Sequence, residues 1–99
     1  MHIISRKKLK EFYKRPEHKD AEGPLETWWY EAKKAEWKSP ADIKARYGSA
    51  SILNSNRVVF NIGGNKYRLV VKINYPIKRV FIRFIGTHKE YDKIDAEVI

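Results

Sequence analysis

The residues best suited to chemistry are gathered around His88, which directly follows an apolar run. A histidine can gain or lose a proton near neutral pH, and Arg83 before it and Tyr91 after it add a cation and a flat ring. Cleavage of RNA needs removal of the 2′-hydroxyl proton, stabilisation of charge on a phosphorane-like transition state, and protonation of the departing 5′-oxygen. If RNA is the substrate, we assign proton transfer to His88, the scissile phosphate to Arg68 and Arg83, and base stacking or orientation to Tyr91. Lys66 is a second candidate for proton transfer if its cationic neighbours lower its pKa.

The sequence around these residues has one sign of charge, because no carboxylate occurs between Asp42 and Glu90. The 47 residues from 43 to 89 carry ten Lys or Arg, whereas residues 1–42 are nearly balanced, and the whole chain has a formal charge of +9. A one-signed surface implies an anionic partner. Flat groups among cations suit the unstacked bases of single-stranded RNA. The residues expected to contact messenger or ribosomal RNA are Arg57, Lys72, Arg79, Phe81 and Lys89.

Other chemistries find little support. Cysteine is absent, so there is no disulfide and no thiolate nucleophile. His2, His18 and His88 lack metal-ligand spacing, and the basic half lacks the carboxylates of a two-metal nuclease, so we expect no metal and no cofactor. No apolar run is long enough to cross a bilayer, and residues 1–10 are too charged for a signal peptide. We therefore expect a soluble cytoplasmic protein without a membrane partner.

Helices are predicted in the first half of the chain, whose total of 99 residues suits a single domain over residues 1–99. The first helix begins at Ser5 and ends before Pro16. Residues 16–23 have the composition of a polar connection. A second helix with an aromatic stripe follows from residue 24, and a short third helix begins after Ser39.

From residue 49 onward the apolar period changes from helical to alternating, and turn residues separate the apolar runs. We expect strands at 52–53, 57–62, 66–75 and 79–87. Alternation places the apolar side chains of the third run on one face and Arg68 and Lys72 on the other; in the fourth run it places Phe84 on the apolar face and Ile85 on the basic one. Gly63-Gly64 is a hairpin turn in this scheme. The predicted fold is α+β: two to three N-terminal helices on a curved antiparallel sheet of about four strands, an open basic face, and a short C-terminal helical segment.

Three segments of the basic half carry a family resemblance. Residues 58–71 read VVFNIGGNKYRLVV, and they are followed by Phe81-Ile82-Arg83 and then by Gly86-Thr87-His88-Lys89-Glu90-Tyr91-Asp92. Together they resemble the HigB toxin family, a RelE-like branch of bacterial toxin–antitoxin systems. The resemblance extends over nearly the whole chain.

The resemblance implies a fold, an activity and a partner. The fold is of the RelE/ParE type, with N-terminal helices on a strongly curved antiparallel sheet. The activity is ribosome-dependent endonucleolytic cleavage of mRNA without a metal, and the partner is an inhibitory HigA-type helix-turn-helix antitoxin. The family's motif positions fall on Asn61, Asn65, Lys66, Arg68, Arg83, His88 and Tyr91 of this chain. The resemblance thereby adds Asn61 and Asn65 to the residues expected to bind RNA.

Two further functions remain open from the sequence. The same sheet could belong to a non-catalytic module that binds nucleic acid or an acidic protein, in which case His88 would be structural or merely exposed. Alternatively, the ParE branch of this fold targets DNA gyrase rather than RNA.

Overall fold

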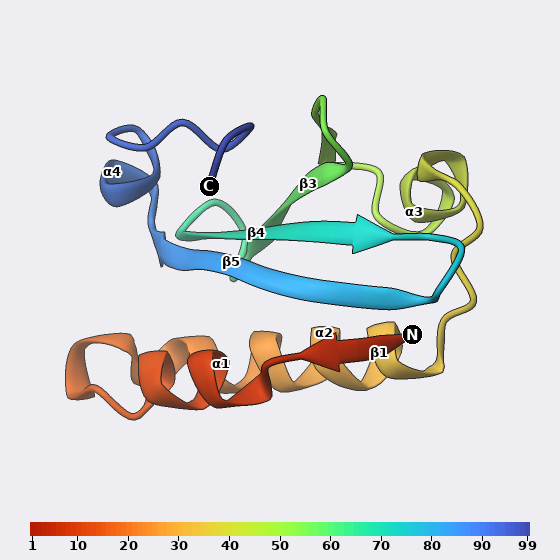
Figure 1. Cartoon of the computed structure of the whole chain (residues 1–99). Helices are drawn as coiled ribbons and strands as arrows, with labels where there is room; N and C mark the ends of the chain where they lie inside the picture. The colour runs from red at the N-terminus through yellow and green to blue at the C-terminus, as the bar shows by residue number, and fades with distance from the viewer.

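The helices of the chain pack on a sheet built mainly from its second half (Figure 1). The computed structural model describes all residues, Met1–Ile99. In chain order the elements are β1 (His2–Ile4), α1 (Arg6–Tyr13), the 3-10 helix η1 (Pro16–Ala21), α2 (Glu22–Lys34), α3 (Pro40–Arg46), β2 (Ser51–Ile52), β3 (Arg57–Ile62), β4 (Tyr67–Asn74), β5 (Arg79–Thr87) and α4 (His88–Tyr91). The predicted α+β class and helix positions are confirmed, whereas the expected polar connection before α2 forms η1.

The sheet has five strands in the order β1-β5-β4-β3-β2. Neighbouring strands are antiparallel except β1, which runs parallel to β5 with Ile3 opposite Val80. The prediction of about four strands, all antiparallel, missed this edge strand. Three residues are too few to show an alternating pattern, and the partner of a parallel strand is distant in sequence.

The main core lies between the helices and one face of the sheet. Phe60 of β3 is near its centre, with the ring of Trp28 at 5.3 Å and that of Trp37 stacked at 6.1 Å between centroids. Eighteen buried residues form this core, and full burial of one such large apolar side chain contributes about 1.5–3 kcal/mol. The apolar face predicted for the third run is buried here, as expected, through Tyr67, Leu69, Val71 and Ile73.

A β-bulge changes the faces of the last residues of β5. The pairing of β4 with β5 shifts by one residue between Val70 and Val71, which leaves Arg83 without a partner in β4. An extra residue of this kind exchanges the faces of the residues that follow it. The predicted faces of Phe84 and Ile85 are therefore wrong: Ile85 packs against the main core, and Phe84 packs against the opposite face of the sheet.

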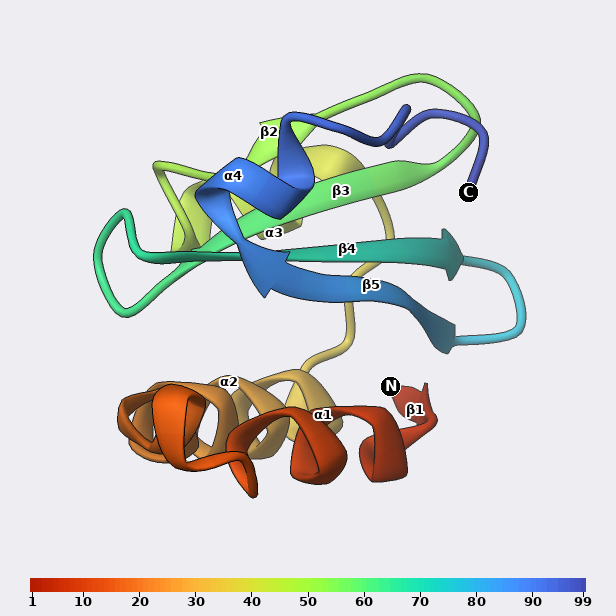
Figure 2. The same ribbon diagram turned by 90° about the vertical axis from the view of Figure 1, so that its left-hand side faces the viewer.

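The face of the sheet opposite α1 and α2 is covered in its middle. Val59, Val70 and Ala96 form a small buried cluster there. The segment that follows α4, residues 92–99, lies on this side of the sheet, away from α1 and α2 (Figures 1 and 2). The expectation of a wholly open basic face is therefore wrong, because the covered middle divides that face into two ends.

Arg57 fastens this C-terminal segment to the sheet. Its Nε and Nη2 donate to the backbone oxygen of Ile99 at 3.2 and 2.6 Å, and its Nη1 donates to the Ser55 carbonyl at 3.0 Å. The side chain is 8% exposed. The guanidinium is thus engaged inside the fold, and we remove Arg57 from the expected RNA contacts.

Candidate active site

The beginning of β4 and the end of β5 meet at one corner of the sheet. Arg68 pairs with Gly86 across the two strands, and the N–H of His88 donates to the carbonyl of Lys66 at 3.3 Å. On its other side Arg68 lies opposite Asn61 of β3. Hairpin pairing thus brings Lys66, Arg68 and His88 together, and we call these three residues the His88 corner.

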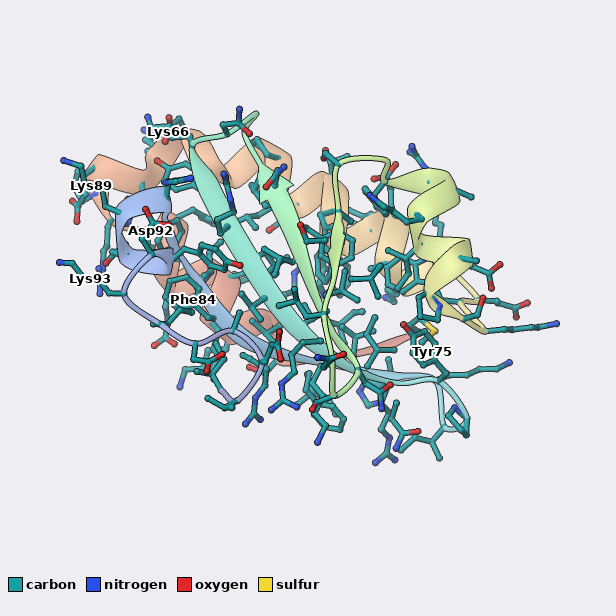
Figure 3. The ribbon with its side chains drawn as sticks, turned by 90° about the horizontal axis from the view of Figure 1, so that it is seen from above. Lys66, Tyr75, Phe84, Lys89, Asp92 and Lys93 are labelled. Atoms are coloured by element: carbon teal, nitrogen blue, oxygen red, sulfur yellow. The ribbon has the colours of Figure 1, made fainter.

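The polar groups around this corner lie at one end of the molecule. Lys66, Lys89 and Asp92 all occur at that end, whereas Tyr75 lies at the opposite end of the sheet (Figure 3). Lys89 and Asp92 are exposed, and Lys89 has no carboxylate partner. This end of the molecule therefore presents exposed groups of both charges, among which Lys89 is unpaired.

A capping box sets the direction of α4 and hence of His88. The Thr87 hydroxyl accepts a hydrogen bond from the Glu90 N–H at 3.2 Å, and the Glu90 carboxylate accepts one from the Thr87 N–H at 2.8 Å. The backbone hydrogen bond from Thr87 lowers the pKa of the Glu90 carboxyl below its ordinary value. Such reciprocal bonds satisfy two backbone donors that a helix start otherwise leaves free. The first helical residue is therefore held in a defined position.

Asp92 orients the imidazole ring. The Nδ1 atom of His88 lies 3.2 Å from Oδ2 of Asp92, and their side chains are 53% and 59% exposed. An ion pair so exposed adds little to stability. Its consequence is chemical instead, because a carboxylate on one ring nitrogen leaves the other, Nε2, free to exchange a proton.

Lys66 is held as a cation by a carboxylate from η1. Its ammonium group donates to Asp20, which also accepts a hydrogen bond from the Tyr67 hydroxyl. The bond to Asp20 raises the pKa of Lys66 above its ordinary value, so the condition on which Lys66 was a candidate for proton transfer is not met. Sequence reasoning missed Asp20 because it lies outside the acid-free interval and 46 residues from Lys66. Nothing in its local sequence marks it.

Arg68 keeps most of its donors available. Its Nη1 donates to the carbonyls of Asn65 at 3.0 Å and Tyr67 at 3.3 Å, and no carboxylate pairs with it. These bonds hold one edge of the guanidinium against the hairpin turn. The remaining N–H groups have the planar geometry that binds phosphate oxygens in pairs.

Three expected RNA contacts lie at the other end of the same face. Lys72 of β4 pairs with Phe81 of β5, and Arg79 pairs with Asn74. Lys72 follows Arg68 by four residues, which along a strand is about 13 Å. The small buried cluster lies between the two ends. Lys72, Arg79 and Phe81 can therefore contact only a part of the RNA remote from His88.

Arg83 and Tyr91, both expected at the catalytic site, contact parts of the fold outside the His88 corner. The bulge at Arg83 directs it to a cleft beside α1, which it lines together with Lys8 and Arg15. Tyr91 is half-buried and packs against the small cluster on the covered face. It thereby helps to hold α4 to the sheet.

Two further features bear on the class of protein. No three His, Cys, Asp or Glu side chains are gathered in a way that could hold a metal ion. No helix is both long and apolar enough to cross a membrane.

Comparison with known proteins identifies a family. Residues 21–94 match the family model of HigB, described as the RelE-like toxic component of a toxin–antitoxin system. The chain is similar to the mRNA interferase toxin HigB of Escherichia coli strain K12, with 34% identity over 97% of this chain and 92% of that protein. The same identity and coverage relate it to the mRNA interferase HigB of Shigella flexneri. The mRNA interferase HigB of Escherichia coli O6:H1 is 26% identical over 95% of this chain and 91% of its own length.

These matches confirm the resemblance that the strand and corner motifs carry. The match to the family model extends from the helical half, where α2 begins, through the His88 corner. The chain belongs to the HigB family of RelE-like toxins of toxin–antitoxin systems.

Proposed function

We propose that this toxin is an mRNA endoribonuclease that acts on the ribosome, without a metal, through attack of the RNA 2′-hydroxyl. The single observation that carries the proposal is the His88 corner, where strand pairing brings an oriented imidazole near Arg68, which has no carboxylate partner, and Lys66, whose ammonium group is paired with Asp20. Relatives that are similar over nearly their whole length bear the name mRNA interferase. The 2′-hydroxyl is already next to the scissile phosphate, so alignment supplies much of the rate.

Each residue of the corner has one part in the proposed reaction. Arg68 and Lys66 hold the non-bridging phosphate oxygens and stabilise the charge that develops on them. His88 exchanges protons with the RNA through Nε2, while Asp92 fixes the ring. The 2′-oxygen forms a bond to phosphorus, the bond to the 5′-oxygen breaks, and one proton passes from the former to the latter. Lys66 is not the base, because Asp20 keeps it protonated.

The partners follow from the family and from the charge of the surface. Membership in a toxin–antitoxin family implies an antitoxin, and we infer that it is a HigA-type helix-turn-helix protein. Ribosomal RNA is the second anionic partner, contacted by Lys72, Arg79 and Lys89, which carry no carboxylate partner. The reaction would take place in the cytoplasm.

Induction in bacteria tests this proposal. We expect His88→Ala and Arg68→Ala to abolish growth arrest and leave transcripts intact while the proteins remain folded by circular dichroism. His2→Ala is the matched control, because His2 is exposed on β1 and lies outside the His88 corner. Full toxicity of both corner variants would remove the site assignment.

Transcript mapping separates the alternatives. New mRNA ends found by primer extension at the onset of arrest would support the enzyme. Tight RNA binding with intact transcripts would indicate the non-catalytic module, and DNA damage without new ends would indicate a gyrase poison of the ParE kind.

A further inference from the structure

A second cationic site lies along the outer edge of β5. β1 pairs only with the first three residues of β5, Arg79 to Phe81. Beyond them the outer edge of β5 has no strand partner, and α1 flanks it instead (Figure 2). A cleft of about 350 Å³ opens between α1 and this edge. The bulge described above directs Arg83 into it.

Three cations from different parts of the chain line the cleft. Lys8 and Arg15 come from α1 and the turn after it, and Arg83 comes from β5. None of the three takes part in any of the four ion pairs of the structure. The one side-chain hydrogen bond among them is that of Lys8 to the Ile82 carbonyl, at a weak 3.5 Å. Unpaired like charges around one cleft repel each other, so an anion bound there would be stabilised.

The remaining walls are apolar or acidic. Phe12, Phe84 and Ile85 supply flat and aliphatic surface. Glu11 makes no side-chain hydrogen bond, whereas Glu90 uses Oε1 for the capping box. An acidic peptide would be repelled by these two carboxylates. A nucleotide would not, because its phosphate meets the cations while the amino group of its base can donate to a carboxylate and its ring can stack on an aromatic side chain.

We propose that this cleft binds one nucleotide of single-stranded RNA, with the phosphate on Arg15, Arg83 and Lys8 and an amino-bearing base against Phe84 and Glu11. Glu90 belongs to both α4 and the cleft, so the cleft adjoins the His88 corner. The inference deepens the proposed function, on which its choice of RNA rests. It assigns Arg83 to binding the RNA beside the cleavage site rather than to binding the scissile phosphate.

Binding can be measured without cleavage. The probe is a fluorescently labelled RNA oligonucleotide with 2′-O-methyl groups throughout, which has no 2′-hydroxyl to attack. We expect Arg15→Ala and Lys8→Ala each to raise its Kd by about tenfold, since each removes a charged contact to phosphate. Each should also lower the slope of log Kd against log salt by about 0.7. Lys7→Ala is the matched control, because Lys7 is exposed on α1, adjacent to Lys8, and lies outside the cleft.

A second measurement tests the base. We expect Glu11→Gln to change the ranking of oligonucleotides that differ in one base while leaving the salt slope unchanged. Equal losses of RNA affinity in Lys7→Ala and Lys8→Ala would mean that only net charge matters, and would overturn the proposal that the cleft binds RNA. Tighter binding of an oligoglutamate peptide than of the oligonucleotide would overturn it in favour of a protein ligand. If Arg15→Ala weakens RNA binding but His88→Ala still cuts mRNA, the cleft proposal is supported and the assignment of His88 as the catalytic residue is contradicted.

Discussion

Substitution of Gly86 by alanine tests how closely the covered face is packed. A Cβ at this position would lie 2.5 Å from Cζ of Phe84, 3.2 Å from its Cε1 and 3.0 Å from Oε1 of Glu90. Carbon atoms in contact prefer about 3.5–4.0 Å, so the ring must move by about 1 Å. The ring is partly buried and packs against the small buried cluster, so a shift of this size costs some of that packing.

The expected cost of Gly86→Ala is that of overpacking, about 1–3 kcal/mol. For a chain of this size we expect the melting temperature to fall by about 5–20 °C. Thermal unfolding followed by circular dichroism measures it. Gly48→Ala is the matched control, because a Cβ at Gly48 meets no atom within 4 Å, and it should be neutral or slightly stabilising.

A double-mutant cycle locates the cause. Leucine at position 84 lacks the two ring atoms that crowd Gly86. We therefore expect Gly86→Ala to cost at least about 1 kcal/mol less in a Phe84→Leu background than alone. Equal melting temperatures for Gly86→Ala and Gly48→Ala, or an additive cycle, would refute the packing argument.

Three further predictions concern the supports of the fold. Arg57→Ala should release Ile99 and lower the free energy of unfolding by about 1.5–3 kcal/mol, because a hydrogen bond from a charged group is lost. Limited proteolysis should then cut the segment 92–99 while other cleavage sites stay protected. Thr87→Ala should remove the capping box and cost about 1 kcal/mol, a loss that Thr87→Ser should largely avoid in thermal melts. Burial and the hydrogen bond to Glu26 raise the pKa of Tyr13 to about 12 from its ordinary 10.0. Because Tyr13 loses its proton at a lower pH in the unfolded chain than in the folded one, the free energy of unfolding should be retained below about pH 10 and decline between pH 10 and 12. Tyr13→Phe should reduce that decline in pH-dependent urea titrations, and an unchanged profile would contradict the assignment.

Local signals account for the part of the fold that the sequence predicts. The hairpin between β3 and β4 forms at Gly63-Gly64, both with positive φ, which glycine adopts without strain. That turn fixes the pairing of Arg68 with Asn61, and the next hairpin brings His88 to Lys66. The His88 corner was predictable for this reason.

The features that the sequence hides depend on contacts between distant segments. The bulge at Arg83 lies inside the predicted strand 79–87, and no turn residue stands next to it. Asp20 reaches Lys66 only when η1 docks on the sheet. In the segment 92–99 nothing local indicates which face of the sheet it covers, although Ala96 is buried. Alternation alone therefore placed Phe84 and Ile85 on the wrong faces.

The parallel pairing of β1 with β5 has a consequence for synthesis of the chain. His2–Ile4 leave the ribosome long before their partners Arg79–Phe81 are made. A contact of such long sequence separation forms late and slows folding. The helices can form on local contacts while the sheet still lacks β5, and His88 follows later still. A nascent or truncated chain that stops before β5 therefore lacks both the pairing of β1 with β5 and the imidazole of the proposed site.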